Sequence, residues 1–154
     1  MDDEVRVDVI SDTHNRVGRD LLDQLQGADL IVSAGDMCSI ADYQALQEAA
    51  PVYMCLGNND YPGEYGPSVG PYATFTYAGL TWQVAHYRES LVPEGFDISI
   101  FGHTHKPVVL QDPINGALSM NPGSPVYPRS VMGPTMGRIL IKGGKILAAE
   151  IIQL

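Results

Sequence analysis

The chain has 154 residues and a mass of 16.7 kDa, which suits one folded domain and is too short for two ordinary ones. Its 45% hydrophobic and 18% charged residues are typical of a globular protein and exclude a disordered chain. The formal net charge of −9 argues against nonspecific nucleic-acid binding, which needs clustered Lys and Arg to contact phosphates. We therefore expect a single domain over residues 1–154.

The first residues, Met-Asp-Asp-Glu, lack the positive and apolar regions of a signal peptide. No apolar stretch approaches the ~20 residues that a membrane-spanning helix needs. The two cysteines, Cys38 and Cys55, have neither CxxC spacing nor the pattern of a disulfide framework. These features predict a cytoplasmic protein that does not contact a membrane.

Hydrophobic periodicity predicts alternating strands and helices in the front half of the chain. The expected elements are a strand at Val5–Ile10, a helix at Arg19–Gln26, a strand at Leu30–Ala34, a helix at Ala41–Ala50 and a strand at Val52–Leu56. This succession is typical of a parallel sheet covered by helices.

The back half of the chain is predicted to be mostly β. An irregular loop, Gly57–Pro71, is dense in Gly, Pro and Tyr. Short strands are expected at Ala73–Tyr77, Leu80–Ala85, Ile98–Phe101, Val108–Leu110 and Ala117–Met120, and a closing hairpin at Arg138–Lys142 and Lys145–Gln153. Two sheets packed face to face, with helices outside, would satisfy both halves.

Side chains able to bind a metal follow five of the predicted strands. They are Asp12, His14, Asp36, Asn58, His86, His103 and His105. Ligands of α/β sheets bind beyond the carboxyl ends of the strands, so these side chains are expected to converge on one rim. All four histidines of the chain belong to this set, which unrelated structural histidines would not be expected to do.

Spacing and chemistry both favour a metal site. Asp12 and His14, like His103 and His105, are two residues apart and would project to the same side of extended backbone. Carboxylates and imidazoles without thiolates suit Mn, Fe, Zn, Co or Ni. The set exceeds one tetrahedral shell and suits two ions that share a carboxylate. Two ions ~3.5–4 Å apart clamp the attacking and leaving oxygens of an in-line displacement, typically at phosphorus.

The order D-x-H, G-D, G-N-x-D, a lone His and G-H-x-H resembles the calcineurin-like metallophosphoesterase superfamily. The Asn121-Pro122-Gly123-Ser124 turn is similar to that of the small YfcE-type phosphodiesterase branch. The resemblance runs from about Asp12 to Arg129. It implies an α/β (α+β) fold, namely a four-layer αββα sandwich of two mixed β-sheets flanked by helices.

The resemblance also implies a role for each candidate ligand. Asp12, His14 and His105 would hold the first ion, Asn58, His86 and His103 the second, and Asp36 would bridge the two. Asp36, Asn58 and His86 would then be catalytic through a metal-bridging hydroxide that attacks a P–O ester in line. Two divalent ions are expected as cofactors, with Mn²⁺ favoured in vitro and Fe, Zn, Ni or Co as alternatives.

Two residues depart from the family pattern. Asn59 occupies the position where many members have a histidine that helps to protonate the leaving group, and an amide cannot act as a general acid. Phosphodiesters and good leaving groups are therefore expected to react better than alkyl monoesters. Tyr87 follows His86 where glycine is common, and it would either narrow the pocket or offer a hydroxyl group.

Residues outside the metal shell are candidates for substrate binding and assembly. Asn15, Asn121, Ser124 and Arg129 are the predicted contacts of a small phosphoester substrate. Asp60 is expected to orient ligands rather than to bind a metal. A homo-oligomer could form through the strands of the back half.

Three other functions stay open. A phosphomonoesterase would use the same metals. A non-catalytic interaction module is the second alternative, because the retromer complex contains a subunit with this fold that acts mainly as a scaffold. The H-x-H motif also occurs in metal-dependent C–N hydrolases, but these usually need a (β/α)₈ barrel of about 250 residues.

Overall fold

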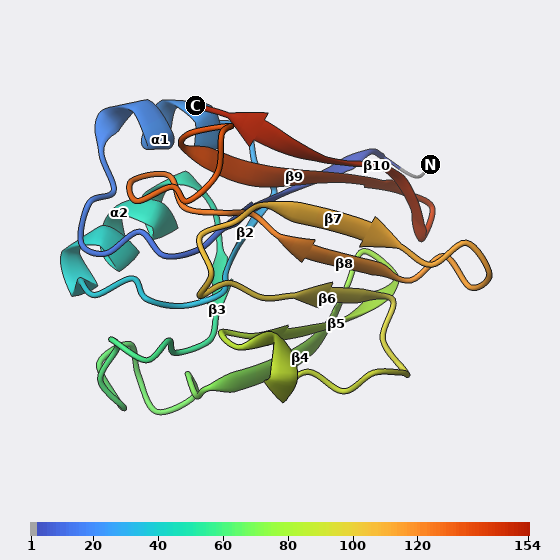
Figure 1. The fold of residues 1–154 in the computed structure, drawn as a ribbon, viewed down its shortest axis with the longest axis horizontal. Coiled ribbons are helices and arrows are strands. Elements are labelled where there is room, and N and C mark those ends of the chain that lie inside the picture. The colour runs from blue at the N-terminus through green and yellow to red at the C-terminus, as the bar shows by residue number, and fades with distance from the viewer. Residues whose placement is uncertain (1–2) are drawn as a thin grey trace.

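Two mixed, five-stranded β-sheets pack face to face in the computed structural model, which describes residues 3–154 (Figure 1). Met1 and Asp2 of the acidic N-terminal run lie outside the described residues. The first sheet has the order β10-β9-β1-β2-β3 and the second the order β4-β5-β6-β8-β7. This arrangement confirms the predicted fold class.

The strands lie close to their predicted positions. In the first sheet they are β1 (Val5–Ile10), β2 (Leu30–Ser33), β3 (Val52–Met54), β9 (Thr135–Lys142) and β10 (Lys145–Gln153). In the second they are β4 (Tyr72–Tyr77), β5 (Leu80–Ala85), β6 (Ile98–Ile100), β7 (Val108–Gln111) and β8 (Leu118–Asn121). The largest difference is in β9, which begins at Thr135 rather than Arg138.

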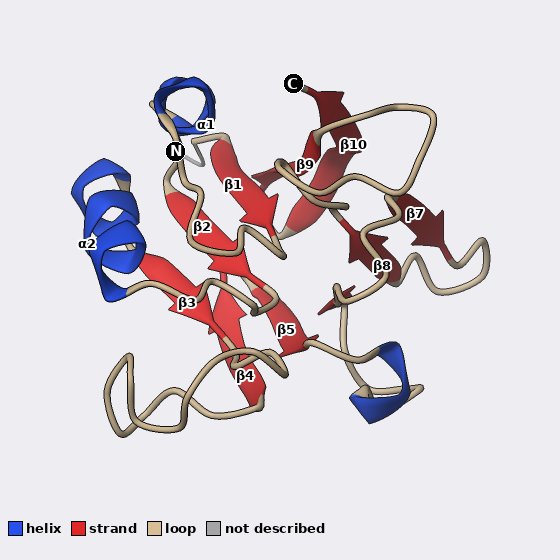
Figure 2. Ribbon diagram, turned by 60° about the vertical axis from the view of Figure 1, so that its left-hand side comes forward, coloured by secondary structure: helices blue, strands red, loops and turns tan. Residues whose placement is uncertain are grey.

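Parallel pairing in the middle of each sheet sets the position of the functional residues. β1 pairs in parallel with β2, and β2 with β3, while β9 and β10 are antiparallel. In the second sheet β5, β6 and β8 run parallel, flanked by antiparallel β4 and β7. The loops that leave the ends of β1, β2, β3 and β5 gather on one side of the sandwich (Figure 2).

The main core lies between the two sheets. Val9 and Val32 of the first sheet belong to one buried cluster with Trp82 and Ile100 of the second. Trp82 is fully buried, and its ring stacks on Phe75 with a centroid distance of 5.5 Å. Burial of apolar surface, worth ~25 cal/mol per Å², therefore holds the two sheets together.

Two α-helices cover the other face of the first sheet. Helix α1 (Arg19–Leu25) buries Leu21 and Leu25, four residues apart, while α2 (Ile40–Ala49) buries Leu46. These side chains form a second buried cluster with residues of the first sheet. A 3₁₀ turn, η1 (Arg88–Ser90), lies between β5 and β6 of the second sheet. No helix in residues 3–154 has the length and apolar composition to cross a membrane.

A buried carboxylate ties β1 to β9 and to helix α1. Asp8 is fully buried, and its oxygens accept hydrogen bonds from Arg6 Nη2 at 2.7 Å and Arg138 Nε at 2.9 Å. Both arginines also donate to backbone carbonyl groups at the end of α1, namely those of Gln24 and Gln26. One cluster of charges therefore satisfies a buried acid and the open end of a helix.

Replacing Asp8 with alanine is expected to lower the free energy of unfolding by about 3 kcal/mol, because two partly buried guanidinium groups lose their counter-charge. Urea denaturation measures this change. The exposed Asp23 of α1 is the control, and Asp23→Ala should change the free energy by less than about 0.5 kcal/mol. Equal effects of the two substitutions would contradict a structural role for the Asp8 cluster.

Candidate metal centre

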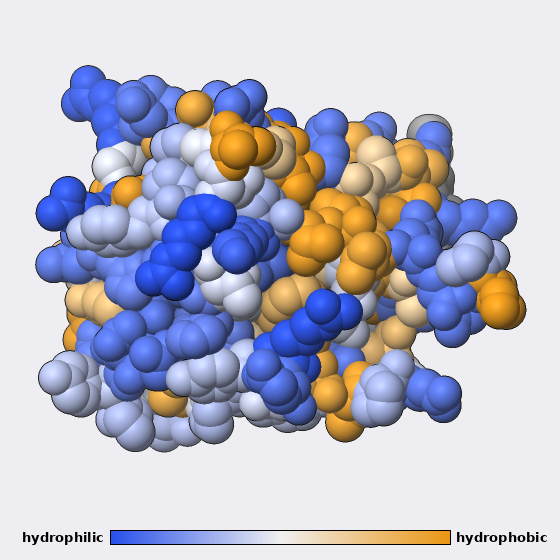
Figure 3. Space-filling view, in the orientation of Figure 1, coloured by the Kyte–Doolittle hydropathy of each residue, from blue (hydrophilic) through white to orange (hydrophobic). Residues whose placement is uncertain are grey.

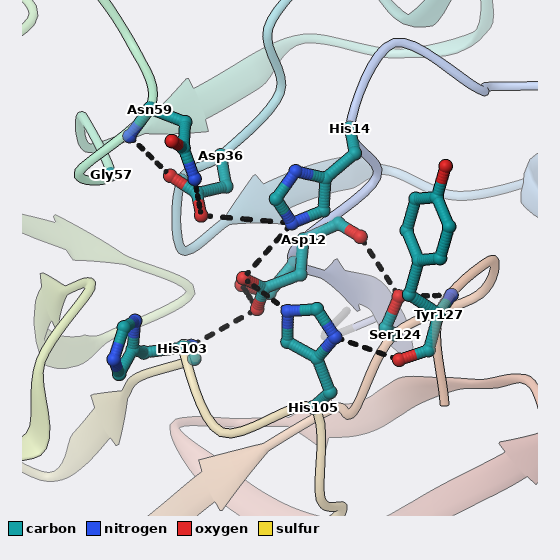
Figure 4. Close-up of polar contacts among 12 residues, drawn as sticks. Asp12, His14, Asp36, Gly57, Asn59, His103, His105, Ser124 and Tyr127 are labelled. Carbon is teal, nitrogen blue, oxygen red and sulfur yellow. Dashed lines mark hydrogen bonds and ion pairs between the residues drawn. The ribbon is translucent and has the colours of Figure 1, made fainter. Parts of the chain in front are cut away.

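Turns from both sheets bring acidic and histidine side chains together at one rim of the sandwich (Figure 4). Asp12 and His14 follow β1, Asp36 follows β2, His86 follows β5 and His105 follows β6. Ligand atoms of Asp12, His14 and His105 lie within 4.8 Å of one another, and so do those of Asp12, Asp36 and His86. Two overlapping groups of Asp and His side chains therefore have the spacing of adjacent metal positions.

One carboxylate oxygen lies at the centre of this arrangement. Oδ1 of the fully buried Asp12 is 3.2 Å from Nε2 of His105, 3.7 Å from Nε2 of His86 and 3.8 Å from Nε2 of His14. This oxygen has no hydrogen-bond partner, whereas Oδ2 accepts from the Ser11 hydroxyl and the His103 amide. A buried, unpaired carboxylate oxygen is costly, and a divalent cation would satisfy it. The donor set thus fits two divalent ions.

Asp36 lies between two of the histidines. Its Oδ2 is 3.7 Å from His14 Nε2 and 3.3 Å from His86 Nε2. Burial raises the pKa of this carboxyl group, but hydrogen bonds from His86 and from the backbone and side chain of Asn59 outweigh burial and hold the pKa at about 2. Asp36 is therefore ionised throughout the range in which metals bind.

Backbone carbonyl groups orient two of the imidazoles. Nδ1 of His86 donates to the Ala34 carbonyl, and Nδ1 of His105 donates to the Tyr127 carbonyl, both at 2.7 Å. Because a carbonyl only accepts, each Nδ1 carries a proton, and in the neutral imidazole each Nε2 presents its lone pair to the centre. His14 differs, since its Nδ1 faces the Cys38 thiol at 3.9 Å.

Asp60 fixes the turns behind Asp36. Its buried carboxylate accepts hydrogen bonds from the backbone amides of Asp36 and Gly57 at 2.7 Å and of Cys38 at 2.9 Å. The Tyr65 hydroxyl donates to the same carboxylate at 3.2 Å. Both oxygens of the Asp60 carboxylate thus accept hydrogen bonds from the surrounding turns, as expected for a group that orients metal ligands.

The backbone of the centre is held in a conformation that favours glycine. Positive φ angles, which cost of order 1–3 kcal/mol at such residues, recur in the metal-centre turns. They are found at Asp12, His14, Asn15, Asp36, Cys38, His103 and His105, with values between 47° and 71°. Two glycines leave room beside the carboxylates, because a Cβ at Gly57 would overlap Asp36 and one at Gly102 would crowd Ser11 and Asp12.

The remaining predicted ligands lie at the edge of this centre. His103 is exposed, with its Nδ1 3.3 Å from His86 Nε2, so that both nitrogens face the same space. Asn58 is exposed and lines a hollow beside His86. The carboxylate common to the two groups of ligand atoms is Asp12, whereas the family pattern gives the shared position to Asp36.

The predicted substrate contacts divide into two pairs. Asn15 and Arg129 are exposed, and Arg129 lines an open hollow with His14 and His105. Asn121 and Ser124 are fully buried, and their side chains bond within the protein: the Asn121 amide donates to the Gly102 carbonyl, and Ser124 Oγ donates to the Asp12 carbonyl. Asn121 and Ser124 therefore support the turns behind the centre and have no surface to offer a substrate.

Sequence reasoning missed Tyr127. Its carbonyl orients His105, its ring packs edge-on against His14 with a centroid distance of 5.5 Å, and the Arg16 guanidinium lies over the ring, 5.5 Å from its centroid. A backbone carbonyl leaves no trace in residue type, and an exposed tyrosine in a Pro-rich segment has many ordinary explanations. The turn after β8 returns the chain to the metal-centre rim, and this position is the signal in the sequence that could have indicated Tyr127.

Known proteins share both the sequence pattern and the fold. A family model described as the calcineurin-like phosphoesterase superfamily domain matches residues 5–144. A probable metallophosphoesterase of Methanothermobacter thermautotrophicus is 30% identical over 163 aligned residues, covering 96% of this chain and 91% of that protein. The chain therefore belongs to the calcineurin-like phosphoesterase superfamily, and its buried Asp and His clusters are those of a metallophosphoesterase.

Solved structures of low sequence identity share this fold. YfcE, a phosphoesterase from E. coli, superimposes with a TM-score of 0.70 and 20% identity, covering 95% of this chain and 98% of YfcE. Vps29 from Entamoeba histolytica, in complex with zinc, gives a TM-score of 0.67 and 20% identity, covering 96% and 98% of the two chains. The same fold thus occurs in the phosphoesterase YfcE and in Vps29.

Gly57→Ala is expected to weaken Mn²⁺ binding by at least about tenfold, because the new methyl group displaces the Asp36 carboxylate. Isothermal titration calorimetry on metal-stripped protein measures the affinity. Gly70→Ala is the matched control, since a Cβ at Gly70 meets no atom within 4 Å. Unchanged Mn²⁺ affinity in Gly57→Ala would show that Asp36 is not a ligand.

Metal affinity is also expected to rise with pH. Burial lowers the pKa of His86, but contact with Asp36 and the charge of Asp12 outweigh it and raise the pKa above its usual value of 6.5. His86 therefore holds a proton in mildly acidic solution, and a metal must displace it. Mn²⁺ affinity should climb by up to about tenfold per pH unit as the pH rises from about 5, and it should level off only above pH 6.5, because the pKa of His86 is raised from that value. Calorimetry across this range tests the expectation, and a flat profile would contradict it.

Proposed function

We propose that this metallophosphoesterase is a dinuclear phosphodiesterase. The observation that carries the proposal is the unpaired, fully buried Oδ1 of Asp12, which three imidazole Nε2 atoms surround at 3.2–3.8 Å. This geometry suits bound cations. Without them, a buried carboxylate oxygen would be left unpaired. Two divalent ions, when bound, would supply an activated water and would clamp the oxygens of a phosphoester.

Each ligand has a proposed role. Asp12, His14 and His105 hold the first ion, whereas Asn58, His86 and His103 hold the second, with Asp36 between them. Asn58 and His103 lie at the exposed edge, so the second ion would be the more accessible to solvent. The backbone carbonyls of Ala34 and Tyr127 keep His86 and His105 in the tautomer that binds metal through Nε2.

The preference for diesters rests on Asn59. Its backbone amide and side-chain amide donate to the two oxygens of Asp36 at 2.9 and 3.0 Å, respectively. An amide in this role restrains a carboxylate and has no proton to give to a departing alkoxide. Esters whose leaving oxygen is already a weak base, such as aryl diesters, need this proton least.

Hydrolysis of p-nitrophenyl phosphate and bis-p-nitrophenyl phosphate tests the proposal directly. Metal-stripped protein should be inactive, and added Mn²⁺ should restore turnover with a higher kcat/KM for the diester. Faster cleavage of the monoester would overturn the diester preference and favour a phosphomonoesterase. Absence of turnover of both esters by Mn²⁺-bound protein would overturn the catalytic proposal.

Asp36→Asn should reduce kcat for the diester by at least about 10²-fold while leaving the circular dichroism spectrum unchanged, because a neutral amide cannot bridge two cations. Asp20→Asn, in the exposed first turn of α1, is the control and should keep full activity. Full turnover by Asp36→Asn would exclude a bridging role.

Asn59→His provides a gain-of-function test. A histidine at this position could protonate the leaving oxygen, a contribution of about 10²–10⁴-fold in other enzymes. The ratio of monoester to diester kcat/KM should therefore rise by at least about tenfold. An unchanged ratio would show that Asn59 does not cause the diester preference.

A scaffold function is the second candidate, and the exposed apolar surface favours it. Apolar side chains gather on one face of the molecule around β7 and β10 (Figure 3). Leu110 of β7 is 47% exposed and Leu147 of β10 is 54% exposed. Light scattering would detect self-association through this face. A stable oligomer that binds no metal would favour the scaffold. The choice of manganese, the cytoplasmic location and the absence of nucleic-acid binding stay predictions.

A further inference from the structure

A hollow beside the proposed second metal position has its own chemistry. Asn58 and His86 form the wall that it shares with the metal centre. The loop between β3 and β4, which carries three prolines and Val69, forms much of the remaining wall (Figure 2). The volume is about 460 Å³, which falls within the usual range of small-molecule sites. We call it the apolar hollow.

Apart from His86, which the hollow shares with the metal centre, the lining of the apolar hollow offers no free charge. Leu56, Val69, Tyr87 and the three prolines supply its apolar surface. Asp60 also lines it, but this residue is only 8% exposed, and its carboxylate already accepts four hydrogen bonds from the protein. A phosphate or carboxylate group would find no counter-charge here, whereas an apolar group would lose contact with water.

Cationic side chains lie on the other side of Tyr87. This residue also lines a second hollow of about 310 Å³, where the cations Arg88 and Lys106 lie with His103 and one acid, Glu89. The Tyr87 ring lies 4.6 Å from the His103 ring and 5.3 Å from the His86 ring, so it stands over the metal-centre edge between the two hollows. Charged and apolar parts of one ligand would therefore be separated on either side of Tyr87.

The apolar hollow is formed before any ligand arrives. The loop is a run of turns closed by backbone hydrogen bonds from Glu64 to Tyr61 and from Gly66 to Gly63. The Leu56 amide donates to the Gly70 carbonyl at 2.8 Å and ties the two ends of the loop together. Prolines further restrict the chain, so little ordering entropy opposes binding.

We propose that the apolar hollow receives an aromatic ester group of the substrate while the phosphorus lies at the metal centre. This inference rests on the proposed function and names its substrate class: phosphoesters that carry a flat aromatic ring. A ring of this kind buries apolar surface against Val69, the prolines and the face or edge of Tyr87. A methyl or ethyl ester would leave most of the hollow filled with water.

Binding of two simple phosphonates tests the proposal without turnover. Phenylphosphonate and methylphosphonate present the same anionic group to the metals and differ only in the group attached to phosphorus. Calorimetry on Mn²⁺-loaded protein should give at least about tenfold tighter binding of phenylphosphonate. Equal affinities, or no binding of either compound, would overturn the proposal.

Gly70→Leu should abolish this preference. Gly70 lines the hollow, its φ is not left-handed, and a Cβ there meets no atom within 4 Å, so a leucine side chain can be accommodated and would fill the space. The affinity ratio of the two phosphonates should fall to about one. Gly18→Leu is the matched control, because Gly18 has equal space, an extended backbone and no part in this hollow. An equal fall in the control would overturn the assignment.

Tyr87→Ala is the second variant, and it removes a wall of the hollow. It keeps the test valid if Gly70→Leu does not fold. The phenylphosphonate preference should fall by about threefold or more, and an unchanged preference would overturn the proposal. A wild-type protein that prefers phenylphosphonate but hydrolyses no ester would refute the proposed function alone and leave the hollow assigned.

Discussion

The uncompensated charge of Asp12 is the constraint around which the metal-centre rim is organised. A carboxylate at the end of β1 is removed from water, yet one of its oxygens has imidazole nitrogens as its nearest polar neighbours and no hydrogen bond. The other oxygen is held by Ser11 and by the His103 amide, which ties the turn after β6 to the turn after β1. One buried charge thus joins the two sheets at the rim, just as apolar packing around Trp82 joins them in the core.

Strain and restraint are combined in the turns that surround this charge. Asp12, Asp36 and His105 adopt left-handed backbone conformations that a free chain would avoid. Asp60 counteracts the strain, because its carboxylate accepts hydrogen bonds from the backbone amides of Asp36, Cys38 and Gly57 in two neighbouring turns. The cost is therefore met during folding, and ligands are held in place before a metal binds.

Residue pattern was sufficient to predict this rim but not its supporting contacts. Asp12, Asp36, His86 and His105 each follow a strand in a parallel part of a sheet, and chain geometry then brings them together. Asn121 is predicted as a substrate contact because its amide could donate to a phosphate oxygen, and Ser124 because it lies in the same turn. Their burial depends on the packing of β8 against the neighbouring turns, which residue type does not reveal. The roles of Ala34 and Tyr127 depend on backbone carbonyls, which all residues share. The helices flanking the sheets are few: α1 and α2 cover the first sheet, and η1 lies in the chain segment that forms the second.

The strand order of the first sheet has a consequence for biosynthesis. β1, which leads into Asp12, lies between β2 and β9, and β9 follows every candidate ligand in the chain. On the ribosome, one edge of β1 thus remains unpaired until the closing β9–β10 hairpin has been translated and has docked. The edge of the strand that leads into Asp12 is consequently among the last parts of the first sheet to be completed.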